Sequence, residues 1–91
     1  MATYLPCSGC GNLDTLTVAD FNLDGNLDIA VTGSLKNSVF YGKGQGKFKP
    51  AVPVADFTGV WVTSGDFNHD GAPDLAISTG GNNVAVLVNK K

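Results

Sequence analysis

The 91-residue chain contains no glutamate and no arginine, and only one histidine, one tryptophan and one methionine. Six lysines against eight aspartates leave a net charge of −2 and no basic patch, so nucleic acid is not expected as a partner. No apolar run approaches the roughly 18 residues that a membrane-spanning helix needs, so a membrane is not expected either. Residues 1–4 lead straight into patterned sequence, and we identify no secretory signal peptide in the chain.

The chain has the size of one small domain, whose hydrophobic core would be thin. Domains of this size often need a metal ion, disulfides or a partner chain for stability. The two cysteines, Cys7 and Cys10, form a C-x-x-C pair in a glycine-rich turn. Three interpretations stay open for the pair: a structural disulfide or inert thiols, an incidental occurrence, and a metal or redox function.

Six of the eight aspartates lie in two copies of one nine-residue stretch, DFNLDGNLD (residues 20–28) and DFNHDGAPD (residues 66–74). The surrounding residues also align, which divides the chain into repeats at residues 1–46 and 47–91. A repeat of 40–50 residues is typical of solenoids and propellers.

Each repeat is predicted to contain four short β-strands and no helix, because its apolar residues are β-branched or aromatic and lack a helical period. Glycine and asparagine clusters separate these runs. The strands are expected at residues 2–5, 16–19, 28–32, 38–41, 48–52, 61–64, 74–78 and 84–88. The sequence therefore predicts an all-β chain.

The spacing of each acidic stretch predicts a calcium site. Side chains at positions 1, 3, 5 and 9 converge on one centre, position 7 adds its backbone carbonyl, and glycine at position 6 allows the sharp turn. Calcium binds six to eight oxygen ligands of this kind, whereas magnesium requires strict octahedral geometry. Two Ca²⁺ ions per chain are expected, with these ligands: Asp20, Asn22, Asp24, Asn26 and Asp28; Asp66, Asn68, Asp70, Ala72 and Asp74.

An EF-hand is excluded by two features of the sequence. It requires a bidentate glutamate at position 12, where this chain has Val31 and Ile77. A strand-like pattern also follows each stretch, where an EF-hand has a helix. Turns without an ion are the other alternative, but three carboxylates in one tight turn repel one another unless a cation compensates their charge.

The two acidic stretches, together with GKGQGKF (residues 42–48), resemble the FG-GAP/VCBS family of propeller repeats found in integrin α-subunit heads and secreted bacterial proteins. The resemblance implies two propeller blades of four antiparallel strands, with the calcium loop joining the innermost strand to the second. It also implies an extracellular or secreted protein. The strands run in the order 4-1-2-3 twice.

Propellers contain about four to eight blades, more than this chain provides. We therefore expect three or four chains to associate head-to-tail and complete a six- or eight-bladed ring, in which strand 3 of one chain pairs with strand 4 of the next. The alternative is that the chain, natural or engineered, is a truncated piece of a longer adhesion propeller.

A calcium-stabilised structural or interaction scaffold without catalysis is the function that we predict. Catalytic side chains are scarce, because Asp14 and Asp56 are the only carboxylates outside the acidic stretches and His69 is the only histidine. The alternative is a carbohydrate-binding propeller, in which Trp61, with Asp56 and Asn83, would contact a glycan; a protein ligand is also conceivable. Trp61 is otherwise expected in a core or between blades, and Phe21 and Phe67 are expected to be buried beneath the loops.

Overall fold

Nine strands form the regular structure of residues 4–89, the part of the chain that the computed structural model describes, and this part contains no helix. The prediction of an all-β chain is therefore confirmed. Since those residues are all strands and loops, they include no helix long and apolar enough to cross a membrane.

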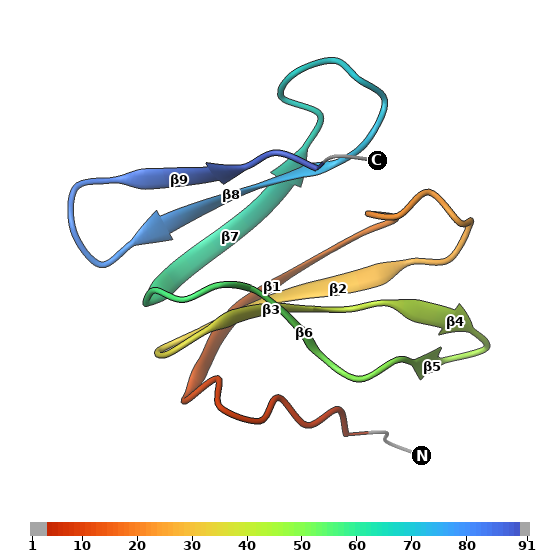
Figure 1. Cartoon of the computed structure of the whole chain (residues 1–91), viewed down its shortest axis with the longest axis horizontal. Helices are drawn as coiled ribbons and strands as arrows, with labels where there is room; N and C mark the ends of the chain where they lie inside the picture. Colours follow the sequence, from red (N-terminus) through yellow and green to blue (C-terminus); the bar gives the residue numbers. More distant parts are fainter. Residues whose placement is uncertain (1–3, 90–91) are drawn as a thin grey trace.

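Two antiparallel sheets contain most of the strands (Figure 1). The first sheet has the order β1-β2-β3-β6, with the bounds Leu13–Ala19, Asp28–Gly33, Asn37–Phe40 and Val52–Ala55. The second sheet has the order β7-β8-β9, with the bounds Gly59–Gly65, Asp74–Thr79 and Val84–Leu87. The short strands β4 (Gly42–Gly44) and β5 (Lys47–Phe48) form a separate hairpin. The order of the first sheet is compatible with a propeller blade.

The outermost strand of the first sheet is β6, so its predicted position at residues 48–52 is wrong by several residues. Gly44, Gln45 and Gly46 have positive φ angles of 85°, 58° and 75°. They close a tight hairpin that pairs Phe48 with Gly42 instead of with β3. Pro50, which has no N–H to donate, lies between this hairpin and β6.

The predicted strand at residues 2–5 is not observed in the part that can be compared. Residues 1–3 lie outside the described residues, and Tyr4 and Leu5 belong to no strand. Further along, the Cys10 carbonyl accepts a 2.9 Å hydrogen bond from Leu35 N, at the turn between β2 and β3. Cys7 and Cys10 form a disulfide, which agrees with the structural interpretation of the C-x-x-C pair.

The core lies between the two sheets, where β1 is packed beside β7 (Figure 1). Its buried residues come from both sheets and from the loop after β1: Phe21, Ala30, Val39, Val62, Leu75 and Ile77. Hydroxyl groups join the innermost strands, because Thr15 Oγ1 accepts a 3.1 Å hydrogen bond from Val62 N and Thr17 Oγ1 lies 3.4 Å from Ser64 Oγ. We call the surfaces of the two sheets that face each other across the core their inner faces.

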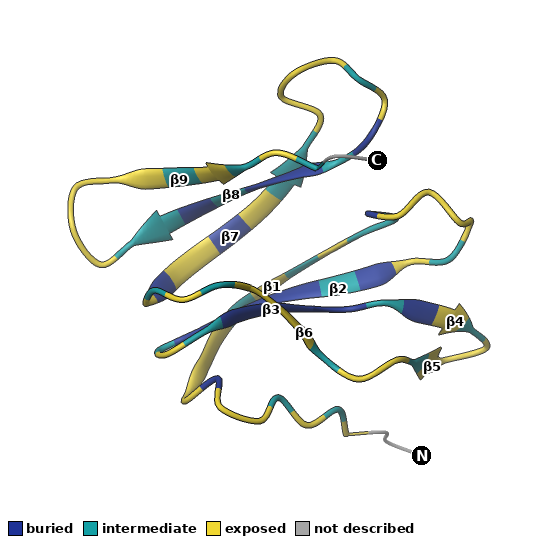
Figure 2. Ribbon diagram, in the orientation of Figure 1, coloured by how far each residue is buried: buried dark blue, intermediate teal, exposed yellow. Residues whose placement is uncertain are grey.

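Residues alternate between the two faces of a strand, so each sheet also has an outer face. The outer face of the first sheet includes Leu16, Val18, Ile29 and Val31. The outer face of the second sheet includes Trp61, Thr63, Ala76, Val84 and Val86. Figure 2 shows the exposed stretches along β1, β7 and β9 that result.

Candidate metal centres in the two acidic loops

The two acidic stretches form the loops between the innermost and second strands of each sheet. The first loop joins β1 to β2, and the second loop joins β7 to β8 (Figure 1). In both sheets the last aspartate of the stretch, Asp28 or Asp74, is also the first residue of the second strand. This aspartate is buried, so each loop is attached to its sheet by a carboxylate inside the protein.

In the first loop the carboxylates organise the backbone around them. Asp20 accepts hydrogen bonds from Asp24 N at 3.1 Å and Gly25 N at 2.8 Å. Asp24 accepts one from Asn26 N at 2.9 Å. Asp28 accepts two, from Phe21 N and Gly42 N, each at 2.8 Å. The loop therefore holds three ionisable groups in fixed positions within nine residues.

The second loop repeats these bonds at equivalent positions. Asp66 accepts from Asp70 N at 3.1 Å and from Gly71 N at 2.9 Å. Asp70 accepts from Ala72 N at 3.0 Å. Asp74 accepts from Phe67 N at 3.0 Å and from Asn89 N at 2.7 Å. The similarity of the two loops thus extends from their sequence to their hydrogen bonds.

Three carboxylates meet in the second loop, where one oxygen from each of Asp66, Asp70 and Asp74 lies within 4.8 Å of the others. The terminal amide of Asn68 points into this group, with one amide atom 3.2 Å from Asp66 Oδ1, 3.0 Å from Asp70 Oδ1 and 3.3 Å from Asp74 Oδ2. If this atom is the nitrogen, it donates hydrogen bonds to the carboxylates. If it is the oxygen, four oxygens surround one centre, and a cation is needed to offset their repulsion.

The three carboxylates of the first loop are gathered less closely than those of the second loop. Among residues 4–89, only the second loop brings three carboxylates within the distance given above. The backbone carbonyls of Asn26 and Ala72 and the side chain of Asn22 stay predicted ligands. The donor chemistry of both loops, which consists of oxygen alone, fits a hard cation such as calcium.

The loop hydrogen bonds also favour the charged form of the carboxylates. The hydrogen bond from Asn26 N lowers the pKa of Asp24 below its ordinary value. The hydrogen bond from Gly71 N lowers the pKa of Asp66, with smaller contributions from Asp70 N and from the charge of His69. Both groups are therefore ionised at neutral pH, which is the form that binds a cation.

Two residues of each loop adopt left-handed backbone conformations. Gly25 and Gly71, at position 6, have φ angles of 90° and 88°, as the turn requires of a glycine. Leu23 and His69, at position 4, have φ angles of 58° and 59°. The sequence contains no signal for the left-handed conformation at position 4, because leucine rarely adopts it. His69 is exposed, as predicted.

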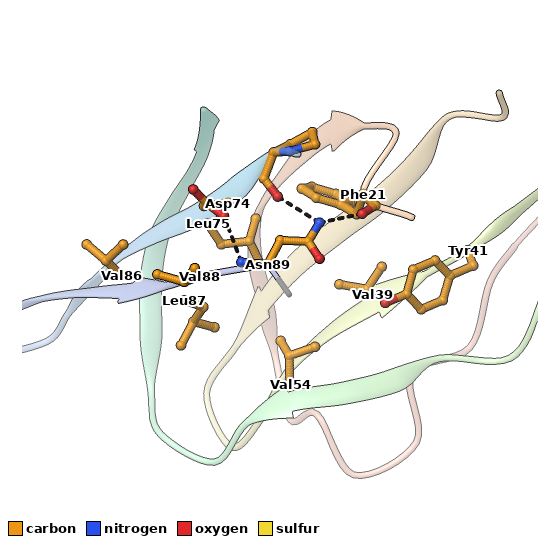
Figure 3. Close-up of a pocket in the computed structure, with 11 residues that line it drawn as sticks. Phe21, Val39, Tyr41, Val54, Asp74, Leu75, Val86, Leu87, Val88 and Asn89 are labelled. Carbon is orange, nitrogen blue, oxygen red and sulfur yellow. Dashed lines mark hydrogen bonds between the residues drawn. The ribbon is translucent and has the colours of Figure 1, made fainter. Parts of the chain in front are cut away.

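Asn89 connects the two loops and was missed by the sequence analysis. Its side-chain amide donates to the carbonyls of Phe21 and Pro73, and its backbone N–H donates to Asp74 (Figure 3). The equivalent bond to Asp28 of the first loop is donated by the backbone of Gly42, in β4. A single asparagine after a strand carries no recognisable pattern, so only the folded structure identifies it.

The predicted aromatic positions differ between the two repeats. Phe21 is 6% exposed and belongs to the core, whereas Phe67 is 50% exposed, so the prediction of a buried Phe67 is wrong. Phe21 packs against residues of the second sheet, and among residues 4–89 no third sheet lies beside the second loop to cover Phe67. Trp61 is 65% exposed, which excludes it from the core of this chain.

A groove of about 560 Å³ opens between the two sheets beyond the core. Its lining is mainly apolar and includes Val39, Val54 and Leu87, with Tyr41 at one side (Figure 3). The residues considered for a glycan, Trp61, Asp56 and Asn83, do not line it.

Comparison with protein families gave one match: the family described as FG-GAP-like repeat matches residues 20–77. The matched segment contains both acidic loops and the strands between them. Neither the comparison with curated proteins nor the comparison with solved structures gave a match.

Proposed function

The chain belongs to the family of FG-GAP-like repeats, and from this we propose that it is a calcium-stabilised β-propeller module, with two blades, that acts as a structural or interaction scaffold without catalysis. The observation that carries the proposal is the second loop. There three carboxylates and one amide are gathered around a common centre, with hydrogen bonds that recur in the first loop.

Calcium is the cation that fits these loops best. Each loop offers oxygen ligands only, and calcium accepts six to eight such ligands in irregular coordination. The ligands of the two sites would be the carboxylates of each loop, the side chains of Asn22 and Asn68, and the carbonyls of Asn26 and Ala72. A bound ion would offset the repulsion among the carboxylates and join the two strands that enter and leave the loop.

An extracellular or secreted location is part of this proposal. The Cys7–Cys10 disulfide is a bond of oxidising compartments. Calcium sites of extracellular modules have dissociation constants of about 10⁻⁴–10⁻³ M, so they are filled outside a cell and largely empty in a resting cytosol.

Head-to-tail assembly of three or four copies into a ring is also proposed. The support for it is the sheet architecture, in which the strand order of the first sheet is compatible with a propeller blade and the open edge of β9 pairs with no described strand. Association would cover such an edge, which otherwise invites aggregation.

The proposed scaffold role involves no catalysis. Six of the eight aspartates lie in the two loops as predicted metal ligands, which leaves few carboxylates for a catalytic site.

Calcium titration by isothermal calorimetry tests the central claim. The chain should bind two ions, and Asp24→Ala and Asp70→Ala should each bind one. Asp56→Ala is the matched control, because Asp56 is exposed and lies outside both loops. Calcium at about 100 times its dissociation constant should add about 2.7 kcal/mol per site to the free energy of unfolding. The absence of bound calcium in the unmodified chain would refute the proposal.

Native mass spectrometry tests the assembly in the same buffers. A species of three or four times the chain mass of 9.4 kDa, with two calcium ions per chain and lost in EDTA, is the expected result. A monomer with two ions would leave the calcium sites in place and exclude the ring.

A further inference from the structure

Asn89 lies between the two acidic loops and donates hydrogen bonds to both of them (Figure 3). Its backbone N–H donates to Asp74 Oδ1 at 2.7 Å, and its side-chain amide donates to the Phe21 carbonyl and, at 2.9 Å, to the Pro73 carbonyl. Pro73 and Asp74 are positions 8 and 9 of the second loop, whereas Phe21 is position 2 of the first loop. We call these three hydrogen bonds the Asn89 bridge.

The two carbonyls that the amide holds belong to the peptide bonds of predicted ligands. The Phe21 carbonyl precedes the nitrogen of Asn22, and the Pro73 carbonyl precedes the nitrogen of Asp74. The N–H of Phe21 in turn donates to Asp28 Oδ2 at 2.8 Å, so this residue also positions the last carboxylate of the first loop. The bridge therefore holds a peptide bond next to a ligand in each loop.

The first repeat has no side chain at the equivalent position. Gly42 donates to Asp28 as Asn89 donates to Asp74, but through a residue that consists of backbone alone. A Cβ at Gly42 would collide with the carbonyl oxygen of Leu27, at position 8 of the first loop, so this position accepts no side chain. The bridge is thus a specific feature of the second repeat.

Charge alone predicts that the two loops do not assist each other in binding calcium. Each loop has three carboxylates, so the binding of one Ca²⁺ changes the charge of a loop from −3 to −1. A filled loop attracts a cation to the other loop less strongly than an empty one does. Salt weakens this effect over about 10 Å, which leaves the sites independent at best. Positive coupling between them would need a structural connection.

Resting on the proposed calcium sites, we propose that the Asn89 bridge makes calcium binding at the two loops positively cooperative. In an empty loop the carboxylates repel one another, which works against the ordered conformation. With calcium bound at the second loop, Pro73 and Asp74 are held in place, and the bridge then holds Phe21 in the conformation that the first loop needs. The second binding event therefore loses less conformational entropy than the first.

Two-dimensional ¹H–¹⁵N NMR of the full chain, titrated with calcium chloride, follows each loop separately. Gly25 N–H donates to Asp20 in the first loop, and Gly71 N–H donates to Asp66 in the second loop. These two amide signals report the calcium occupancy of their own loops. The affinity of one loop can therefore be measured while a substitution disables the other.

The affinity of each loop should depend on the occupancy of the other. Asp70→Ala, which removes a predicted ligand of the second loop, should weaken the calcium binding that is read at Gly25 by about 5-fold or more. Asp24→Ala should weaken the binding that is read at Gly71 by the same factor, because coupling between two binding sites is reciprocal. Charge predicts the opposite sign, because the disabled loop retains a charge of −2 whereas a filled loop has −1.

The same substitutions in an Asn89→Gly background isolate the bridge. There, each should change the affinity of the other loop by less than about 2-fold, because the connection is missing. If Asn89 had only a structural role, its loss would weaken both sites and leave the effect of one loop on the other unchanged. Asn89→Leu, which keeps a side chain of similar shape without a donor, should behave like Asn89→Gly. The matched control is Asn82→Gly, an exposed asparagine in the turn between β8 and β9, which should retain the coupling.

Two results would overturn the coupling and leave the calcium sites in place. One is an affinity at Gly25 that Asp70→Ala does not lower. The other is an equal effect of Asp70→Ala in the unmodified chain and in both Asn89 variants. A chain in which neither Gly25 nor Gly71 responds to calcium would overturn the proposed function and the coupling together.

Discussion

The two acidic loops share six of their nine residues and have the same internal hydrogen bonds, yet they lie in different surroundings. The first loop has its phenylalanine in the core and the second sheet beside it. The second loop has its phenylalanine half exposed and gathers its three carboxylates more closely. The conformation of each loop is thus local, whereas the burial of its aromatic residue depends on the neighbouring sheet.

Asn89 shows how the two loops are connected. In the second repeat Asn89 takes the place that Gly42 has in the first. Its side chain donates hydrogen bonds to the carbonyls of Phe21 and Pro73. The first loop therefore has contacts with both repeats, through Gly42 and Asn89, whereas Asn89 contacts the second loop from within the same repeat. This difference predicts unequal responses to identical substitutions.

The largest effect is expected for the buried carboxylates. Asp28→Ala and Asp74→Ala each leave two backbone N–H groups without an acceptor. At about 1–3 kcal/mol for each unpaired group, both should lower the free energy of unfolding by about 2–6 kcal/mol. Urea denaturation in EDTA measures this effect without bound calcium. Asp24→Ala, which removes one exposed acceptor, is the control, and an equal loss there would contradict the interpretation.

Substitution of the phenylalanine in each loop should give the clearest difference in stability between the two loops. Phe21→Ala removes a core side chain and should destabilise by about 3–5 kcal/mol. Phe67→Ala removes a half-exposed side chain and should change the stability of the monomer by about 0.5 kcal/mol or less. Thermal unfolding at low protein concentration compares the two variants. Similar destabilisation by both changes would mean that Phe67 is covered within a single chain.

A smaller effect is expected at the connection between the loops. Asn89→Gly makes the second sheet resemble the first, keeps the backbone bond to Asp74, and removes the bonds to Phe21 and Pro73. It should destabilise by about 1–3 kcal/mol, because two carbonyls lose their donor. Hydrogen exchange should show faster opening around Phe21, in the other sheet. Protection unchanged at the first loop would exclude this coupling.

The smallest effect is expected at position 4 of the loops, and its sign is opposite. Leu23→Gly and His69→Gly relieve a left-handed conformation that disfavours larger residues by about 1–2 kcal/mol. After the entropy loss of glycine, each should raise the free energy of unfolding by about 0.5–1 kcal/mol. Calorimetric melting in EDTA measures the change. A loss of stability at either position would show that the side chain contributes contacts that outweigh the strain.

Much of the local structure was predictable from the residues. Runs of β-branched and aromatic residues without a helical period predicted most of the strands, and the glycine at position 6 predicted the sharp turns at Gly25 and Gly71. The position of β6 was not predictable, because Phe48 can pair with β3 or with β4, and the tight hairpin at residues 44–46 pairs it with β4.

The sequence by itself determined most of the strands, the two turns and the hydrogen bonds within each acidic loop, because these depend on backbone preferences and on bonds over nine residues. Only the tertiary structure decided that Phe21 is buried and Phe67 is exposed, that Asn89 joins the two loops, and that Trp61 lies on an open face. These properties depend on which sheet packs against which, and similar short segments acquire different surroundings when only one of them has a neighbouring sheet.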